Sequence, residues 1–403
     1  MKIGILSKNY AAKRLFLNKF AKAEYKDIRY NNYYLWRYSY LWFLKMIGKL
    51  NMSPEESASK LFYRYKNILP TGCDIYHFFN TINYTSKPWV INIESGLPWT
   101  IDVIRCVEST NGNLENIKGN KEVAKALKQL AKPNCLGLMA LSECTRKIQL
   151  EILNQFPEYK KEIEKKLITL HPPQELQVSD IKEKELEYEN TPLTFVYVGR
   201  DYFRKGGRET VEILSEIREK FEFKLILISD LRIDEFRYLR TDNDLESAKN
   251  LIKKNSSWIE HYEFLPNDQV LEKIKKSHVA LLPTWMDTYG YSVLECQACG
   301  TPVITTSLRA MDETNNSDIG WLIKVPVNRY NHPIHNTKTE QDKFAQILKK
   351  GLKECIINIL ENPSLIRVKA EKCIANIKEN HSPDEYNKNL ELIYENRINE
   401  LQK

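Results

Sequence analysis

Two carboxylates stand near the start of one predicted helix. The apolar run Val279–Leu282 and the β-branched run Val303–Thr306 are typical of buried strands, and the segment between them, which ends at Gly300, predicts a helix. Asp287 precedes this helix and Glu295 lies about one turn inside it, so both side chains can face one site. Carboxylates in that position suit the hydroxyls of a sugar and a ribose. The alternative is that both are solvated side chains without a ligand.

The same unit has the features of an anion-binding site. Ser292 is the expected N-cap of the helix, and Gly300 is the expected residue after its C-terminus. Ligands of parallel sheets bind where strand ends meet helix N-termini, and here that junction is Trp285–Tyr291. We expect its backbone N–H groups to face an anion.

The region around Glu295 resembles the retaining glycosyltransferases of family GT4, which have the GT-B fold. Members carry a Glu, seven residues and a second Glu, usually followed by small residues and Gly-x-Pro-Val. Here Glu295 and the Gly-Thr-Pro-Val run at 300–303 match the second half, and Asp287 replaces the first Glu. The resemblance implies that Glu295 binds the ribose and Asp287 the donor sugar. It also implies that the amides of Gly290 and Tyr291 reach phosphate or sugar.

A loop after another predicted strand, Phe195–Val198, adds two cations, Arg200 and Lys205, beside Gly206. Cations in a loop are most often solvent-exposed, but these two match the Gly-Arg and Lys-Gly pair of the same family. The resemblance implies that both hold the donor diphosphate, through charge-assisted bonds that stabilise the leaving group. It further implies that the enzyme needs no metal and no cofactor besides the sugar nucleotide.

Glu94 follows the predicted strand Trp89–Ile93 in the first half of the chain. The family carries an acidic residue or a His facing the reacting sugar at this strand end, so Glu94 is expected to steady an oxocarbenium-like transition state. The alternative is that Glu94 only caps the next segment. No protein nucleophile is required if the leaving phosphate assists the acceptor's attack from the same face. The catalytic candidates are therefore Glu94, Asp287, Arg200 and Lys205.

Length and composition predict two folded domains. The 403 residues suffice for two cores, and 42% hydrophobic with 28% charged residues is typical of a globular protein. We expect an α/β protein with the GT-B fold, in which two Rossmann-like, doubly wound domains face each other across a cleft. Residues 1–172 would form the acceptor-binding domain, with helix 384–403 packing back on it, and residues 173–383 the nucleotide-sugar-binding domain. Residues 174–190 are expected to be an exposed insertion.

Several other classes are disfavoured by the sequence. No stretch approaches ~20 apolar residues, and the N-terminus lacks the apolar core of a signal peptide, so we expect a cytoplasmic protein, with peripheral attachment to the inner face of the membrane as the alternative.

Cys296 and Cys299 have metal-like spacing, but no second pair accompanies them. Pro333 between His332 and His335 argues against a helix there, so we expect no metal site.

The first fifty residues carry the basic excess of the chain. They hold eleven Lys and Arg against two acidic side chains, a net charge of +9, whereas the whole chain carries +7. Aromatic side chains crowd among these cations between residues 30 and 50. This mixture suits a membrane interface or single-stranded nucleic acid, and the alternative is a helix that packs its aromatics on the domain core. We expect no nucleic-acid partner. The aromatic residues are Tyr33, Tyr34, Trp36, Tyr38, Tyr40, Trp42 and Phe43.

The resemblance predicts transfer of a sugar from a UDP- or GDP-sugar to a hydroxyl acceptor with retention of configuration. The expected acceptor is a glycan or a lipid-linked compound in the synthesis of cell-surface polysaccharide, lipopolysaccharide or glycolipid. A catalytically degenerate GT-B binding subunit remains open, because Asp287 replaces a Glu and the predicted loop Ser7–Arg14 contains no Gly. A GT-B sugar-nucleotide epimerase also remains open. A phosphorylase would need a pyridoxal-binding lysine motif, which the sequence does not show.

Overall fold

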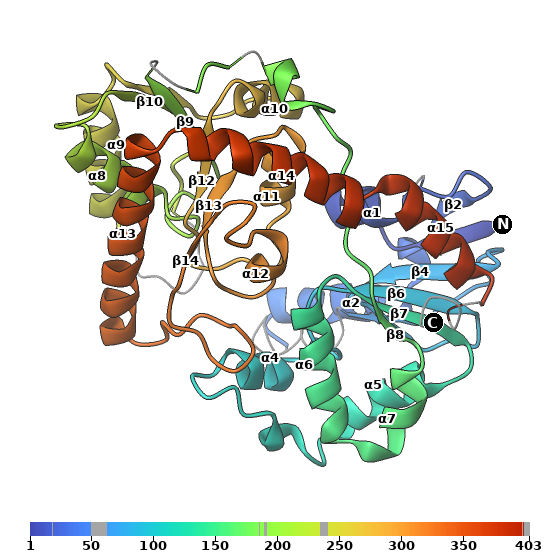
Figure 1. Cartoon of the computed structure of the whole chain (residues 1–403). Coiled ribbons are helices and arrows are strands. Elements are labelled where there is room, and N and C mark those ends of the chain that lie inside the picture. The colour runs from blue at the N-terminus through green and yellow to red at the C-terminus, as the bar shows by residue number, and fades with distance from the viewer. Residues whose placement is uncertain are drawn as a thin grey trace. The chain divides into compact units, whose positions relative to one another are not determined.

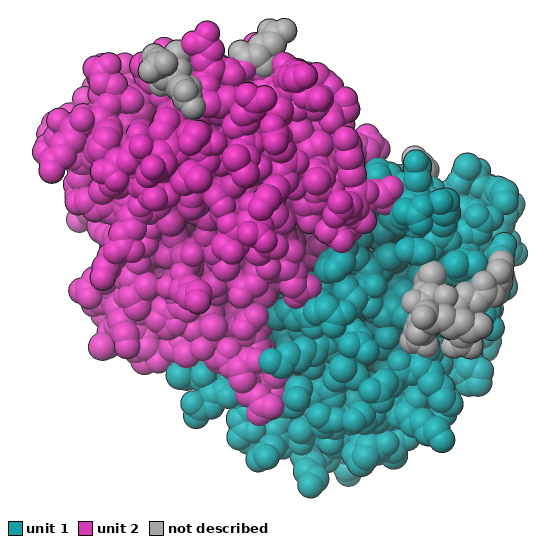
Figure 2. Space-filling model, viewed as in Figure 1, with its two compact units in different colours: residues 1–173, 383–403 teal, residues 174–382 magenta. Residues whose placement is uncertain are grey.

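The chain folds into two compact units, which Figure 2 colours separately. Unit 1 comprises Met1–Pro173 with Pro383–Lys403, and unit 2 comprises Gln174–Ser382. The predicted α/β class is confirmed, because each unit is built on a parallel sheet of six strands. The computed structural model describes residues 1–17, 19–49, 63–184, 186–188, 192–233, 241–396 and 398.

The sheet of unit 1 has the strand order β2-β1-β4-β6-β7-β8, with all strands parallel. All five residues of β6 are buried, as expected for a parallel sheet with both faces covered. Chain order reverses between β1 and β4, which creates a topological switch point. The strands are β1 (Lys2–Ile5), β2 (Glu24–Asp27), β4 (Ile75–Phe79), β6 (Trp89–Ile93), β7 (Cys135–Ala140) and β8 (Leu167–Thr169), and a separate pair is formed by β3 (Arg64–Tyr65) and β5 (Ile82–Asn83).

Helices cover both faces of this sheet. In Figure 1, α5, α6 and α7 lie on one side of the strands, and α1 and α15 lie on the other. The C-terminal helix α15 packs on the sheet, where the side chain of Ile393 lies over Gly137 of β7. The helices are α1 (Tyr10–Leu15), α2 (Tyr33–Met46), α4 (Ile101–Glu108), α5 (Lys121–Ala131), α6 (Glu143–Asn154), α7 (Pro157–Glu164) and α15 (Pro383–Tyr394), with short 3-10 turns η1 (Arg29–Asn31) and η2 (Leu114–Ile117).

The sheet of unit 2 has the strand order β11-β10-β9-β12-β13-β14, again with all strands parallel. Its chain order reverses between β9 and β12. Ligands of doubly wound sheets bind outside the carboxyl ends of the strands at such a switch point. The strands are β9 (Leu193–Val198), β10 (Phe223–Ile228), β11 (Ile259–Tyr262), β12 (Val279–Leu282), β13 (Val303–Thr306) and β14 (Trp321–Ile323).

Helices also cover both faces of the second sheet. Figure 1 shows α8 beside α13 on one side of the strands and α11 beside α14 on the other. Two helices begin with a capping box, in which Thr241 caps α9 and Thr337 caps α13. The helices are η3 (Ile181–Lys184), α8 (Gly207–Ile217), α9 (Asp242–Lys254), α10 (Asn267–Lys275), α11 (Tyr291–Ala298), α12 (Met311–Thr314), α13 (Lys338–Glu361) and α14 (Ser364–Asn380).

Three predicted element boundaries are wrong. Ser292 is not the N-cap of α11. The helix begins at Tyr291, and its N-cap is Gly290, whose φ is +83°. The predicted loop Ser7–Arg14 contains the start of α1, where Asn9 Oδ1 accepts the Ala12 N–H at 2.9 Å. The helix expected over 384–403 ends at Tyr394 as α15. Residues 397 and 399–403 of that prediction lie outside the described residues.

The segment after the predicted linker is not an exposed insertion. Val178 and Ile181 are buried against Ala370 and Ile374 of α14. The side chain of Lys184 is also buried, and its ammonium donates to the Ser277 carbonyl at 3.0 Å and to Thr301 Oγ1 at 2.5 Å. Burial lowers the pKa of Lys184 to about 8. Within 174–184, the segment is therefore part of the core of unit 2. Residues 185, 189 and 190 of the predicted insertion lie outside the described residues.

No helix among the described residues combines the length and apolarity that crossing a bilayer demands.

Lys184 predicts a pH dependence of stability. Its pKa is about 8 in the folded protein against 10.5 for an ordinary Lys, so between these values the unfolded chain binds more protons than the folded chain. The stability contributed by this group therefore rises with pH through that window, by up to about 1.4 kcal/mol per pH unit. We expect the difference in unfolding free energy between the natural protein and Lys184→Met, measured in urea, to increase from pH 8 to pH 10. A constant or falling difference would contradict this assignment.

Candidate active site

The residues predicted to bind the donor lie in two loops of unit 2 and in the helices that follow them. One loop follows β9 and leads into α8, and the other follows β12 and leads into α11. β9 and β12 are paired neighbours at the switch point, with Tyr197 opposite Leu281, so their ends lie side by side. Lys205 and Asp287, 82 residues apart in the sequence, are brought into contact there.

Lys205 and Asp287 form an ion pair between Nζ and Oδ2. Their side chains are only 15% and 16% exposed. Asp287 also accepts the Thr288 N–H through Oδ1 at 2.9 Å. Burial alone would raise the pKa of Asp287, but the charge and hydrogen bond of Lys205 outweigh it and hold that pKa below its ordinary value. Asp287 is therefore a carboxylate at neutral pH.

Arg204 fixes the two loops to each other. Its guanidinium donates to the Met286 carbonyl at 3.0 Å and to the Asp201 carboxylate. Its own carbonyl accepts the Trp285 N–H at 2.9 Å and the Thr284 hydroxyl at 3.2 Å. Arg204 is not among the residues predicted from the sequence, since nothing in the spacing of residues 204 and 286 indicates this contact. The backbone on either side of the Lys205–Asp287 pair is thereby held in place.

Arg200 is not part of the ion pair. Its side chain is 78% exposed, and its Nε lies 3.9 Å from Oδ2 of Asp230. The same carboxylate also lies 3.5 Å from Nε of Arg232, which pairs on its other side with Asp201. Arg200 thus stands at the rim of the switch point as an exposed cation.

Two glycines open the helices behind these loops. Gly206 and Gly290 are the N-caps of α8 and α11, with φ of +77° and +83°, and neither helix has a side-chain cap. A Cβ on Gly206 would lie 2.0 Å from the Pro283 carbonyl oxygen, so the close approach of the two loops requires Gly there. Both helix N-termini are suited to an anion. Tyr291 and Glu295 are half-buried in the first two turns of α11.

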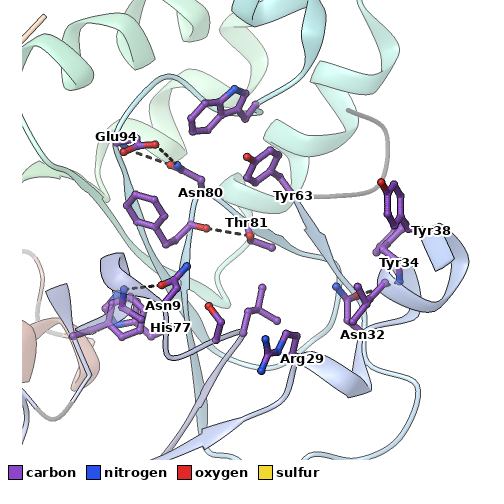
Figure 3. Close-up of a pocket in the computed structure, with 17 residues that line it drawn as sticks. Asn9, Arg29, Asn32, Tyr34, Tyr38, Tyr63, His77, Asn80, Thr81 and Glu94 are labelled. Carbon is purple, nitrogen blue, oxygen red and sulfur yellow. Dashed lines mark hydrogen bonds between the residues drawn. The ribbon is translucent and has the colours of Figure 1, made fainter. Parts of the chain in front are cut away.

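Unit 1 has a pocket of about 430 Å³ at its own switch point. The ends of three strands contribute to it: Ser7 follows β1, Asn80 and Thr81 follow β4, and Glu94 follows β6. Figure 3 shows Glu94 and Asn80 on one side of the pocket and Tyr34 and Tyr38 of α2 on the opposite side. The side of the pocket opposite Glu94 is therefore formed in part by two tyrosines, with Asn32 beside them.

Glu94 is positioned by its neighbours and does not cap a helix. Its carboxylate accepts the Asn80 amide at 3.2 Å, and its N–H donates to Asn80 Oδ1 at 3.2 Å. The N-cap of the next α-helix, α4, is Thr100, so the capping alternative is wrong. Tyr63 lines the same pocket and stacks on Trp99 with ring centroids 5.2 Å apart.

His77 also lines this pocket but is unsuited to proton transfer. Its Nε2 lies 2.6 Å from Asn92 Oδ1, and its Nδ1 lies 2.6 Å from the Tyr394 hydroxyl. Because a carbonyl oxygen only accepts, Nε2 donates and Nδ1 accepts from Tyr394. Complete burial lowers the pKa of His77 to about 3, so the ring stays neutral and links α15 to the sheet.

No three His, Cys, Asp or Glu side chains of the described ranges are grouped as metal ligands. Cys296 and Cys299 are buried thiols whose pKa is raised, chiefly by burial.

Several solved structures share the architecture of this chain. A glycosyltransferase from Rickettsia africae ESF-5 matches with a TM-score of 0.54 at 15% identity over 98% of each chain. WaaG, a glycosyltransferase involved in lipopolysaccharide biosynthesis, matches at 0.55 and 15% over 96% of this chain and 99% of WaaG. Anabaena Alr3699/HepE in complex with UDP matches at 0.55 and 12% over 98% of this chain and 100% of that one. The fold is therefore GT-B, as predicted.

Residues 178–354 match the family model described as glycosyl transferases group 1. This stretch contains both loops of the β9/β12 switch point and the Lys205–Asp287 pair. The protein thus carries a group 1 domain and is a glycosyltransferase. The resemblance drawn from Glu295 and its neighbours is confirmed at the level of this group. A comparison with curated proteins gives no match.

The buried ion pair predicts strong energetic coupling. In a double-mutant cycle with Lys205→Met and Asp287→Asn, we expect a coupling energy of about 1–3 kcal/mol, because each single change leaves a buried group without its partner. The measurement is urea unfolding of the four proteins. The exposed pair Lys338 and Asp342 on α13 is the control and should couple by no more than about 0.5 kcal/mol. Equal coupling energies in the two cycles would show that the Lys205–Asp287 pair contributes no more to stability than an exposed ion pair.

Proposed function

We propose that this glycosyltransferase moves a sugar from a UDP- or GDP-sugar to a hydroxyl acceptor with retention of anomeric configuration. The observation that carries the proposal is the convergence of Lys205, Asp287 and two helix N-termini at the β9/β12 switch point. A nucleoside diphosphate needs cations and N–H donors, and a sugar needs carboxylates, and this site offers both. The Anabaena Alr3699/HepE structures in complex with UDP and with UDP-glucose support a sugar nucleotide as the ligand of this fold.

Each donor-binding residue has a proposed role. Lys205 and Arg200 bind the diphosphate, and the amides of Gly290 and Tyr291 contact phosphate or sugar. Asp287 binds hydroxyls of the donor sugar. The ribose is bound by Glu295, which lies on the same helix as Tyr291.

The ion pair explains how Lys205 is positioned for this task. Asp287 holds the ammonium in a place where it is 15% exposed, so little side-chain freedom is lost when a phosphate oxygen approaches. Because the pair is neutral overall, the surplus positive charge comes from Arg200 and the two helix N-termini. As the bond from the anomeric carbon to the phosphate breaks, these groups stabilise the negative charge that accumulates on the diphosphate.

Acceptor chemistry is proposed to involve unit 1. Glu94, fixed by Asn80 in the pocket, would stabilise positive charge on the reacting sugar. The acceptor hydroxyl would give its proton to the departing phosphate oxygen while its own oxygen bonds the anomeric carbon from the same face. No protein nucleophile then takes part, and the configuration is retained.

The proposed setting is the synthesis of cell-surface polysaccharide, lipopolysaccharide or glycolipid at the cytoplasmic face of a membrane. Two observations support it: the involvement of WaaG, which shares the fold, in lipopolysaccharide biosynthesis, and the basic, aromatic segment of residues 30–50. The acceptor is then a glycan or a lipid-linked compound.

The proposal is tested by a screen of sugar nucleotides. The protein is incubated with UDP- and GDP-sugars, and the released nucleotide and sugar products are identified by mass spectrometry. We expect one donor to bind and to be hydrolysed slowly without an acceptor. Binding of a donor without turnover would favour a binding subunit, and conversion to an epimeric sugar nucleotide would favour an epimerase.

We predict that this activity requires no divalent metal, since Lys205, Arg200 and the helix N-termini supply the positive charge. Turnover of the preferred donor should be the same with a chelator as with added Mg²⁺ or Mn²⁺. Activity that a chelator abolishes and a metal restores would contradict the prediction.

We also predict that Arg200→Ala and Lys205→Ala each weaken binding of the free nucleoside diphosphate. Loss of one charge-assisted contact costs about 1.5–3 kcal/mol, which corresponds to roughly 10- to 150-fold in affinity. Isothermal titration calorimetry with UDP and GDP measures the affinity of each variant. Arg367→Ala, an exposed Arg on α14, is the control and should bind like the natural protein. Unchanged affinity in both loop variants would remove these residues from the site.

A further inference from the structure

Helix α2 exposes apolar side chains where a surface helix normally exposes polar ones. Trp36, Tyr40, Trp42, Phe43 and Met46 are each between 52% and 63% exposed, and no residue of the helix is buried. The alternative that this segment packs its aromatics on the domain core is therefore wrong for both tryptophans. A contiguous exposed apolar surface of this kind marks an interaction site.

Charge identifies the partner. Helix α2 contains Arg37 and Lys45, both exposed, and no acidic residue, and Lys49 follows it. Tryptophan and tyrosine side chains concentrate at the interface of lipid bilayers, and Lys and Arg beside them are attracted by anionic headgroups. The exposed aromatic side chains of α2 and its basic side chains therefore both suit an anionic lipid surface.

The opposite side of α2 belongs to the pocket of unit 1. Tyr34, Leu35 and Tyr38 are half-buried, and all three line the pocket. Tyr34 and Tyr38 lie about one turn apart, on the face of the helix turned away from Trp36 and Tyr40. Helix α2 therefore lines the pocket with two tyrosines (Figure 3) and also exposes an apolar surface to solvent.

We propose that α2 docks unit 1 on an anionic membrane, and that the pocket it lines takes its hydroxyl acceptor from that membrane. The second part of this inference rests on the proposed function. An acceptor drawn from a bilayer carries a polar head with the reacting hydroxyl, which suits Glu94 and Asn80, and an apolar portion, which suits the tyrosines of α2. The acceptor class is then lipid-linked rather than a free glycan.

The docking step is tested by co-sedimentation of the full chain with vesicles. Phosphatidylcholine vesicles with and without phosphatidylglycerol are compared at low and high salt. We expect binding to the anionic vesicles that is lost at high salt, because the attraction of exposed charges fades within a Debye length of about 8 Å at physiological salt. Absence of binding to anionic vesicles at low salt would overturn the proposal.

Two variants assign the binding to α2. The charge reversal Arg37→Glu, Lys45→Glu, Lys49→Glu should weaken binding to anionic vesicles by 100-fold or more, on the basis of about 1 kcal/mol for each cation near the surface. Trp36→Ala with Trp42→Ala should weaken binding to the anionic vesicles at low salt as well, because the interfacial contacts of both rings are lost. The matched control reverses three exposed lysines of α5 in the same unit and should keep most of the binding: Lys121→Glu, Lys125→Glu and Lys128→Glu.

Equal loss in the α5 control would show that only overall charge matters and would overturn the assignment to α2. Binding of single-stranded oligonucleotide that both α2 variants abolish, without vesicle binding, would also overturn it in favour of nucleic acid. Binding of UDP or GDP, measured on the same variants, should be unchanged. If the natural protein binds no nucleotide but still binds vesicles through α2, then the proposed function fails while the docking surface stands.

Discussion

The pairing of β9 with β12 is the constraint on which the candidate active site depends. These two strands are neighbours in the sheet although 80 residues separate them, and the helices that follow them leave on opposite sides, α8 toward α13 and α11 toward α14 (Figure 1). The two connecting loops therefore begin side by side and lead to helices on opposite faces of the sheet, with both helix N-termini following the same pair of strand ends. The contact between Lys205 and Asp287 follows from this topology.

The energetic cost of the site is concentrated in one buried ion pair. Two charges removed from water lose several kcal/mol of solvation each, and a single contact restores this only with good geometry and further hydrogen bonds. Asp287 has such a bond from Thr288, and Arg204 fixes the surrounding backbone at Met286 and Trp285. The structure thus keeps a cation and a carboxylate in place before any ligand arrives, which is the preorganisation that transition-state stabilisation needs.

The sequence predicted the structure best at positions where burial restricts the residue types that can occur. A central strand of a parallel sheet is buried on both faces, so β6, β12 and β13 stand out as short runs rich in apolar or β-branched residues, with the observed bounds. The edge strands β2 and β11 were not predicted, because they are only partly buried and lack such runs. The family spacing placed Lys205 and Asp287 in one site, but it gave no sign that they pair or that Arg204 joins their loops. The pocket of unit 1 was missed for a similar reason, since Tyr63 and Trp99 meet only after folding.

The proposed function requires that the nucleoside diphosphate binds at the β9/β12 switch point. Backbone hydrogen exchange with and without UDP or GDP tests this most directly, because it reports the binding position independently of turnover. We predict slower exchange in residues 199–207 and 284–295, which hold both loops and both helix N-termini. Unchanged exchange in these segments, with protection confined to residues 77–99 around the pocket of unit 1, would contradict it.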